Sequence, residues 1–211
     1  MRSIGIFGTS GFAREVSDIA SAVGLKPIFI TPSHSPLECS ELIDDVIEER
    51  EIESCSIDFF SIGVGDNNLR KKIAGKYSES LNFINLIHPS ATMGRLQIDK
   101  LEDSKGLIIC AGVRLTNNIS VGKFVICNLN ATIGHDVRID DFVNIAPGAC
   151  VSGNVHLAEC SYVGTGAVIR QGLPNKKVFL GAGSIIGANS TVIKDCEPGG
   201  IYVGSPCRRI K

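Results

Sequence analysis

Apolar residues recur at every sixth position through the middle of the chain. The series consists of Ile109, Leu115, Val121, Cys127, Ile133, Ile139, Ile145, Val151, Leu157, Val163 and Ile169. A second series, which contains no charged residue, lies two positions earlier: Val113, Ile119, Val125, Ala131, Val137, Val143, Ala149, Val155, Ser161 and Ala167. Positions two apart share a face of a strand, so each unit predicts a short strand followed by a corner. Stacked units of this kind form a parallel β-helix.

The corners are expected where a residue that tolerates a positive φ follows the sixth position. Such residues are Gly122, Asn128, Gly134, Asp140, Gly164 and Gly187. The period breaks after Ile169 and resumes through Ile186 and Val192. Residues 171–178 are therefore predicted to form an outward loop or irregular coil.

The first 87 residues show a different pattern, in which strand-like runs alternate with helical ones. Strands are predicted at 3–7, 26–31, 59–64 and 82–87, and helices at 12–23, 40–50 and 69–77. The first helix carries its apolar stripe on Phe12, Val16, Ile19, Ala20 and Val23, and Gly24 ends it. This alternation predicts a small parallel α/β sheet.

A glycine-rich turn, Gly8-Thr9-Ser10-Gly11, joins the first strand to the first helix. Backbone N–H groups at such a turn can hold a phosphate or nucleotide, although a tight turn without a ligand fits equally well. A dinucleotide fold is disfavoured, because Ile6 stands where its fingerprint needs a glycine. Gly65 and Asp66 end the 59–64 strand at the same edge of the sheet, which favours a bound ligand.

Composition narrows the function classes. The chain of 211 residues has a formal net charge of −1, which disfavours a polyanionic partner such as nucleic acid. No apolar run approaches the length of a membrane span, and no signal peptide is recognisable, so a cytoplasmic protein without membrane insertion is expected. The 8 cysteines form no CxxC pair and are expected to be reduced.

Four segments together resemble a known enzyme family. They are residues 6–16 (IFGTSGFAREV), residues 87–91 (IHPSA), Gly134-His135-Asp136 and residues 202–206 (YVGSP). They are similar to the nucleotide-sugar and sialic-acid acetyltransferases of the hexapeptide-repeat group. The resemblance implies an α/β parallel-sheet domain at 1–87, which binds the nucleotide sugar, and a left-handed parallel β-helix with the acetyltransferase site at 88–211.

His135 is the candidate general base. It is one of 4 histidines and lies outside the apolar series, so it is predicted to face outward. Asp136 beside it is expected to orient the ring and favour its protonated form. The resemblance implies direct transfer from acetyl-CoA to a sugar amine, and it places Asn144 near the acetyl-CoA as an oxyanion donor. A corner asparagine with positive φ is the equal alternative for Asn144.

The remaining site predictions also follow from the resemblance. Thr165 and Gly183 match turns that line the pantetheine arm, and Gly8, Thr9, Ser10, Gly11, Gly65 and Asp66 are candidates for the acceptor. Arg208, Arg209 and Lys211 either contact the CoA phosphates or are simply solvated. No metal site is expected, because the β-helix offers only His135 and His156. A homotrimer with the active site between subunits is expected.

Three functions remain open at this point. The first is N-acetylation of a nucleotide-linked amino sugar of the 4-amino-4,6-dideoxy type, in glycan or surface-polysaccharide precursor synthesis. The second is O-acetylation of sialic acid or a related sugar, and the third is a non-catalytic β-helix scaffold. Relatives that use UDP sugars place acidic residues after the second strand, where this chain has Thr31-Pro32-Ser33-His34. A dTDP sugar, a GDP sugar and a free sugar acid therefore all remain as acceptors.

Overall fold

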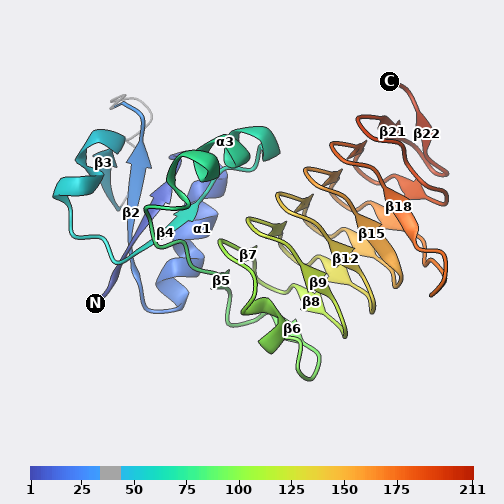
Figure 1. Cartoon of the computed structure of the whole chain (residues 1–211), viewed down its shortest axis with the longest axis horizontal. Coiled ribbons are helices and arrows are strands. Elements are labelled where there is room, and N and C mark those ends of the chain that lie inside the picture. The colour runs from blue at the N-terminus through green and yellow to red at the C-terminus, as the bar shows by residue number, and fades with distance from the viewer. Residues whose placement is uncertain (34–43) are drawn as a thin grey trace.

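The computed structural model describes residues 1–33 and 44–211, and it begins with a parallel sheet (Figure 1). Strand β1 (Ser3–Phe7) lies between β2 (Lys26–Thr31) and β4 (Phe59–Ile62), and β3 (Asp45–Glu48) extends the sheet beside β2. Helix α1 (Gly11–Ala22) follows β1, and α3 (Asn67–Tyr77) follows β4. The predicted small parallel α/β sheet is confirmed, since every strand pair in it is parallel.

Two local predictions in this sheet were wrong. The helix predicted at 40–50 is replaced, within the described residues, by β3 and the 3-10 helix η1 (Glu49–Ser54), because Val46 and Ile47 pair with β2 and complete its open edge. Residues 40–43 and His34 lie outside the described residues. Val23 was expected on the buried stripe of α1, but the helix ends at Ala22 and Val23 is exposed.

The rest of the chain winds into a parallel β-helix with three faces, visible in Figure 1 as a stack of coils. The first face contains β5 (Leu86–Ile87), β7 (Ile108–Ile109), β10 (Ile126–Cys127), β13 (Asn144–Ile145), β16 (Tyr162–Val163), β19 (Ile185–Ile186), β21 (Ile201–Val203) and β22 (Arg208–Arg209). The second contains β6 (Thr92–Met93), β8 (Arg114–Leu115), β11 (Thr132–Ile133), β14 (Cys150–Val151), β17 (Val168–Ile169) and β20 (Thr191–Val192). The third contains β9 (Ser120–Val121), β12 (Arg138–Ile139), β15 (Val155–Leu157) and β18 (Val178–Leu180). The 3-10 helix η2 (Asp99–Leu101) precedes β7.

Both apolar series point into the interior, as the two-residue spacing predicted. Every member of the two series is buried except Val121, which is partly exposed. The loop predicted at 171–178 is also confirmed, since β18 begins only at Val178. Burial of these Val, Ile and Ala side chains stabilises the stack, at about 25 cal/mol per Å² of apolar surface.

The positive φ angles fall two residues later than predicted. They occur at Asn118, Asn130, Asp136 and Gly148, three positions after the apolar residue, and not at Gly134 or its equivalents. The glycines directly after the apolar positions are required for a different reason, because the neighbouring coil approaches too closely for a side chain. An added Cβ on Gly134 would lie 2.6 Å from the backbone nitrogen of Gly153.

The junction between sheet and β-helix also differs from the prediction. Of the strand predicted at 82–87, Phe83 forms an isolated parallel bridge with Phe60 of β4, and only Leu86 and Ile87 form a regular strand, which pairs with β7 in the first face of the β-helix. The parallel sheet packs over the beginning of this same face. Ile108 and Ile126 point outward from the β-helix and yet are buried, in one apolar core with side chains of β1 and α1 such as Ile6.

Candidate functional site

Three corners separate the faces of each coil, and in one coil they are 128–131 (first corner), 134–137 (second corner) and 140–143 (third corner). His135 lies in the second corner, and half of its side chain is exposed. Its Nδ1 lies 2.7 Å from Oδ2 of Asp136. The predicted outward orientation and the contact with Asp136 are therefore present, and the positive φ of Asp136 (+60°) makes this contact between adjacent residues possible.

The environment of Asp136 determines which ring nitrogen of His135 carries the proton in the neutral imidazole. The Asn118 side-chain amide donates a 2.5 Å hydrogen bond to Oδ1 of Asp136, and this bond together with His135 lowers the pKa of Asp136. The carboxylate is thus ionised at neutral pH and can only accept hydrogen bonds. Nδ1 of His135 must then carry a proton, so in the neutral imidazole the lone pair that can take a proton from a substrate is on Nε2.

Gly153 supports the imidazole from the following coil. An added Cβ at Gly153 would lie 2.6 Å from Nε2 and 2.7 Å from Cε1 of His135, so the ring lies directly against this glycine. Gly153 is itself buried. The ring is therefore held on one side by backbone and along one edge by Asp136, with its other side open to solvent.

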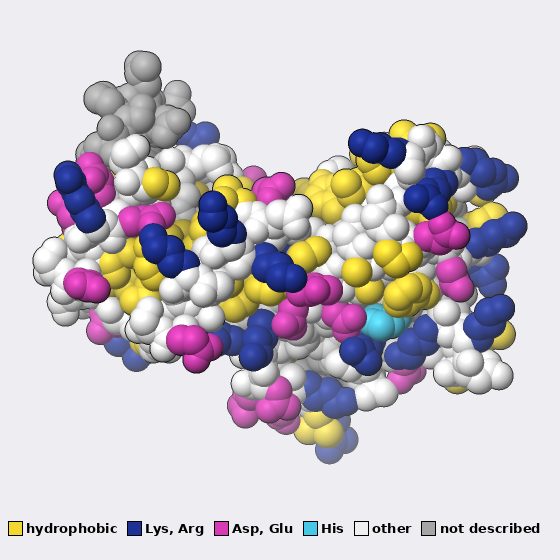
Figure 2. Space-filling model, turned by 45° about the horizontal axis from the view of Figure 1, so that its top comes forward, with side chains coloured by type: hydrophobic (Ala, Val, Ile, Leu, Met, Phe, Trp, Pro, Cys, Tyr) yellow, Lys and Arg dark blue, Asp and Glu magenta, His cyan; other side chains and the backbone are white. Residues whose placement is uncertain are grey.

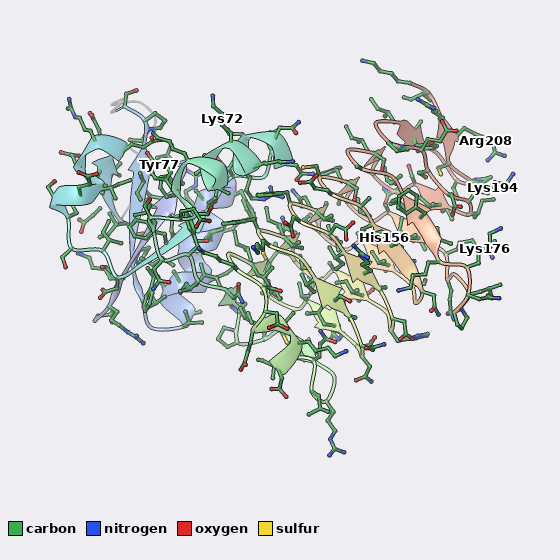
Figure 3. All side chains as sticks on the ribbon, viewed as in Figure 1. Lys72, Tyr77, His156, Lys176, Lys194 and Arg208 are labelled. Carbon is green, nitrogen blue, oxygen red and sulfur yellow. The ribbon has the colours of Figure 1, made fainter. Side chains whose placement is uncertain are left out.

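The Gly8 turn lies at the carboxyl ends of the parallel strands, beside a cavity of about 360 Å³. Residues of β1, β2, η1 and α3 line the cavity, Lys72 and Tyr77 of α3 among them, together with Gly8, Pro32 and Val64 from the turns that follow the strands. Figure 3 shows Lys72 and Tyr77 on α3. Thr9 and Ser10 continue the turn into Gly11, the first residue of α1, and no side chain caps this helix. Of the four predicted residues in the turn, only Gly8 lines the cavity.

Gly65 and Asp66 lie at a different place, where the sheet meets the third corner of the β-helix. They line a second hollow of about 450 Å³ together with Cys160, Tyr162 and Gly183. Oδ1 of Asp66 accepts a 2.7 Å hydrogen bond from the Leu69 amide, so this carboxylate also caps the start of α3. Figure 2 shows the molecular surface hollowed between the sheet and the far end of the β-helix.

Asn144 lies beside this hollow, in strand β13 and not at a corner with positive φ, so that alternative was wrong. The residue is buried, and its Nδ2 donates a 2.9 Å hydrogen bond to the carbonyl of Gly65. Its Oδ1 is buried without a hydrogen-bond partner among the described residues. The amide that was expected to face an oxyanion is therefore engaged with the sheet in a single chain.

The predicted site residues do not converge within one chain. His135 and Asp136 occupy the second corner, Gly183 and Asn144 lie at or beside the third, and Thr165 is exposed at the first. The three corners are separate edges of the β-helix. A site that uses residues from all of them needs surfaces from more than one copy of the chain.

Cations gather at the far end of the second corner. Arg170, Lys176, Lys177 and Lys194 line a hollow of about 510 Å³ in which Asp195 is the one acidic residue. The Lys177 ammonium also donates a 2.7 Å hydrogen bond to the carbonyl of Asp136. Figure 2 shows Lys and Arg side chains over this end of the molecule, and Figure 3 labels Lys176 and Lys194 there.

The C-terminal cations lie next to this group. Arg208 borders a neighbouring hollow with Lys194. Arg209 is paired with Glu197 and donates to the carbonyl of Lys211, so its charge is partly satisfied within the chain.

His156 has a different setting from His135. Its Nε2 lies 2.8 Å from Asp140, and its ring packs edge-on against Phe179 on the third face. Within residues 1–33 and 44–211, no group of three His, Cys, Asp or Glu side chains is placed to hold a metal ion. In the same ranges, no helix is both apolar enough and long enough to cross a bilayer.

Comparison with known proteins identifies relatives along the whole chain. Residues 3–77 match the model of the PglD N-terminal domain. GDP-perosamine N-acetyltransferase from Escherichia coli O157:H7 is 27% identical over 234 aligned positions, which cover 100% of this chain and 97% of the relative. The structure of WeeI from Acinetobacter baumannii AYE matches with a TM-score of 0.87 at 28% identity over 100% of both chains. The acetyltransferase domain of PglB from Neisseria gonorrhoeae FA1090, in complex with acetyl coenzyme A, matches with a TM-score of 0.85 at 26% identity over 99% of both chains.

Over its whole length the chain is similar to sugar acetyltransferases built on a left-handed parallel β-helix. The predictions of the family and of the fold class are confirmed. The roles of the individual site residues and the division at residue 87 remain predictions.

Three residues that contact the candidate site residues were missed in the sequence. Asn118 and Gly153 each lie one coil away from the His135–Asp136 pair, and the Asn118–Asp136 contact spans 18 residues. Three six-residue units make one coil. A comparison of residues 18 positions apart in the sequence would therefore have identified Asn118 and Gly153 as neighbours of the pair. Arg70, which contacts the carbonyl of Gly65, was missed because no local pattern marks a helix arginine as buried.

Proposed function

We propose that this acetyltransferase transfers an acetyl group from acetyl-CoA to the amine of a nucleotide-linked 4-amino-4,6-dideoxy sugar. The full-length similarity to GDP-perosamine N-acetyltransferase supports an amino-sugar nucleotide as acceptor, and the acetyl coenzyme A complex of the PglB domain supports the donor. Such sugars are precursors of glycans and surface polysaccharides, and we place the reaction in the cytoplasm.

One observation of the structure carries the catalytic part of the proposal. His135 presents Nε2 at an exposed corner while its Nδ1 lies against an ionised Asp136, so in the neutral imidazole the lone pair is on Nε2. In the reaction, the neutral sugar amine attacks the thioester carbonyl carbon and His135 takes the proton from the nitrogen. The C–S bond then breaks, the thiolate of CoA leaves, and the imidazolium returns the proton to the sulfur. No covalent acyl-enzyme forms.

The second corner offers a path for the donor. From His135 the corner continues past Gly153, which has no side chain, to the cations around Lys176 and Lys194. Three coil spacings of about 4.8 Å separate the His135 corner from the Lys194 corner. The phosphopantetheine arm lies between the thioester of acetyl-CoA and its phosphates. If these cations bind the phosphates, the thioester would therefore lie near His135. Thr165 and Gly183 would line this arm from a neighbouring subunit.

The acceptor nucleotide is assigned to the sheet, residues 1–87, and the acetyl transfer to residues 88–211. The cavity beside Gly8 lies at the carboxyl ends of β1, β2 and β4, where ligands of open α/β sheets bind. The apolar floor of Phe7, Ile30 and Tyr77 suits a base, and Lys72 at its edge suits a phosphate, whereas Lys76 is already paired with Glu49 at 2.8 Å. The uncapped start of α1 at Ser10 and Gly11 adds backbone N–H groups beside it.

We propose a homotrimer in which each active site lies between two subunits. The separation of His135 from Asn144 and Gly183 on different corners supports this arrangement, because a neighbouring chain can bring a second corner to the first. Exposed apolar side chains on the β-helix, among them Val168 and Ile185, also favour contact with another subunit.

Thiol release from acetyl-CoA tests the function directly. The acceptor panel contains GDP-, dTDP- and UDP-linked 4-amino-4,6-dideoxy sugars, together with sialic acid as an O-acetylation acceptor. Replacing His135→Ala should lower kcat by roughly 10²- to 10⁴-fold, the usual contribution of a general base, while the affinity for acetyl-CoA is kept. Unchanged turnover in this variant would remove His135 from the reaction. Turnover with none of the acceptors would favour the scaffold alternative.

A further inference from the structure

Arg70 is the largest fully buried side chain in the described part of the molecule, with 1% exposed. Nε donates to the Phe124 carbonyl at 2.9 Å, and Nη1 donates to the carbonyls of Val64 at 3.0 Å and Gly65 at 3.1 Å. Nη2 donates to the Phe142 carbonyl and to Oδ1 of Asn67, both at 2.8 Å. Every N–H of the guanidinium thus has an acceptor.

These acceptors belong to two parts of the molecule. Val64 and Gly65 form the turn between β4 and α3, whereas Phe124 and Phe142 are third-corner residues in successive coils of the β-helix. Both phenylalanines have positive φ, +53° and +58°, which is unusual for bulky residues. Their rings stack at 5.4 Å, and their carbonyls accept from Arg70. The β-helix is therefore locally strained at the point where it receives the guanidinium.

Further contacts tie the same turn to the β-helix. Nδ2 of Asn67 donates to the Cys160 carbonyl at 2.8 Å, one coil beyond Phe142, and Asn144 donates to the carbonyl of Gly65. Residues 64–67 are thus fastened to three successive coils, and Arg70 is the centre of these contacts.

Burying an arginine between two apolar surfaces costs free energy, because the charged guanidinium loses its hydration. Among the described residues, no carboxylate lies within 4.0 Å of its guanidinium, and burial lowers the pKa of Arg70 to about 10, so the group is still charged at neutral pH. Packed apolar side chains join surfaces without desolvating a charge, whereas a guanidinium fork with five donors imposes one geometry on the groups it contacts. The contacts of Arg70 therefore fix the position of the turn on the β-helix more than they strengthen the contact between the two parts of the molecule.

We propose that Arg70 is a positioning residue that fixes the turn of residues 63–66 on the third corner of the β-helix, and thereby sets the acceptor sugar at the correct place for transfer. This role rests on the proposed function. The turn connects the two hollows already described, since Val64 lines the cavity beside Gly8 and Gly65 lines the hollow with Gly183. A displacement of the turn would move the acceptor relative to the thioester, whereas the cations of the second corner that are proposed to bind the CoA phosphates would keep their places.

The test uses Arg70→Met and Arg70→Lys in the full chain, with the fastest acceptor of the nucleotide-sugar panel. In both variants the KM for the acceptor should rise about tenfold or more and kcat should fall, whereas the KM for acetyl-CoA should change much less, because the cations of the second corner do not contact the turn. Lysine keeps the charge and is the variant to use if methionine prevents folding. It lacks the fork and should not restore the acceptor KM.

Lys71→Met is the matched control, because the ion pair of Lys71 with Glu159 joins the same two elements at the surface, at 2.7 Å. Both KM values should stay unchanged in this variant. If the Arg70 variants have a lower Tm but unaltered KM values, the residue is only structural and the proposal is wrong.

Amide hydrogen exchange distinguishes a failure of the role proposed for Arg70 from a failure of the proposed function. If the wild-type protein acetylates no acceptor, the function fails, and exchange alone then tests the placement of the turn. The amides of residues 63–66 should exchange faster in Arg70→Met than in the wild type, while those of β1 and β2 keep their protection. Equal protection of residues 63–66 in the two proteins would overturn the role of Arg70.

Discussion

The imidazole of His135 is oriented by two neighbours that act in different ways. Asp136 accepts the proton of Nδ1, and Gly153 leaves room for the ring against the next coil. Gly153→Ala would place a methyl group 2.6 Å from Nε2 and force the ring away. We expect kcat to fall by roughly 10²-fold, because a shift of about 1 Å has that effect on an aligned catalytic group. Steady-state kinetics measures it.

Gly75→Ala is the control for this substitution. Gly75 lies in α3 with nothing within 4 Å of an added Cβ, so alanine there should leave kcat unchanged and slightly stabilise the helix. An unchanged kcat in Gly153→Ala would show that the ring has another productive position.

Asp136→Asn tests the assignment of the proton on His135. A carboxylate only accepts, whereas an amide can also donate to Nδ1 and so allow the proton to reside on Nε2, which then is no base. We expect kcat to fall by roughly 10²-fold with the KM for acetyl-CoA retained. The variant is isosteric and should fold. A kcat equal to that of the wild type would mean that Asp136 does not select the tautomer.

At the scale of the elements, the interior of the β-helix contains one polar exception in the apolar series. Ser161 is fully buried, and its hydroxyl has no hydrogen-bond partner among the described residues. Ser161→Ala should therefore raise the free energy of unfolding by about 1 kcal/mol, since an unpaired buried hydroxyl destabilises the fold. Urea denaturation measures this change. Ala167→Ser, at the next position of the same series, should lower the stability by a similar amount.

The loop before β18 is the second element with a testable role. Lys176→Gln with Lys194→Gln should raise the KM for acetyl-CoA about tenfold if these cations hold its phosphates. Acetyl-pantetheine lacks these phosphates, so its KM should be the same in the variant and the wild type. Lys123→Gln, at an exposed site on another corner, is the control. If the KM rises equally for acetyl-CoA and acetyl-pantetheine, these lysines support the structure of the site and do not bind the phosphates.

At the scale of the whole molecule, the assignment of the active site to two subunits predicts complementation. His135→Ala removes the base, and Val64→Trp fills the acceptor cavity, so each variant alone should be inactive. If equal amounts assemble together, about a quarter of the sites combine an intact His135 with an intact cavity from different chains. Thiol release by the co-refolded mixture measures the recovery. No recovery in a mixture that assembles would place the whole site in one chain.

The sequence by itself determined the elements that depend on local periodicity. The six-residue repeat predicted which side chains enter the β-helix, and it also predicted that His135 points away from the interior, because its position is not on the inward face. The alternation of strands and helices likewise predicted β1, β2 and α3 close to their observed bounds. These features follow from residues that are near one another in the chain.

Only the tertiary structure decided the features that depend on neighbours in other coils or in the sheet. Residues 45–48 form a strand because β2 offers an open edge, and Gly134 is small because Gly153 approaches it. Arg70 is buried because carbonyls from two coils and one turn converge on it, and the candidate residues spread over three corners because the coil has three faces. A local pattern records which way a side chain points, but the groups it meets there come from distant parts of the chain.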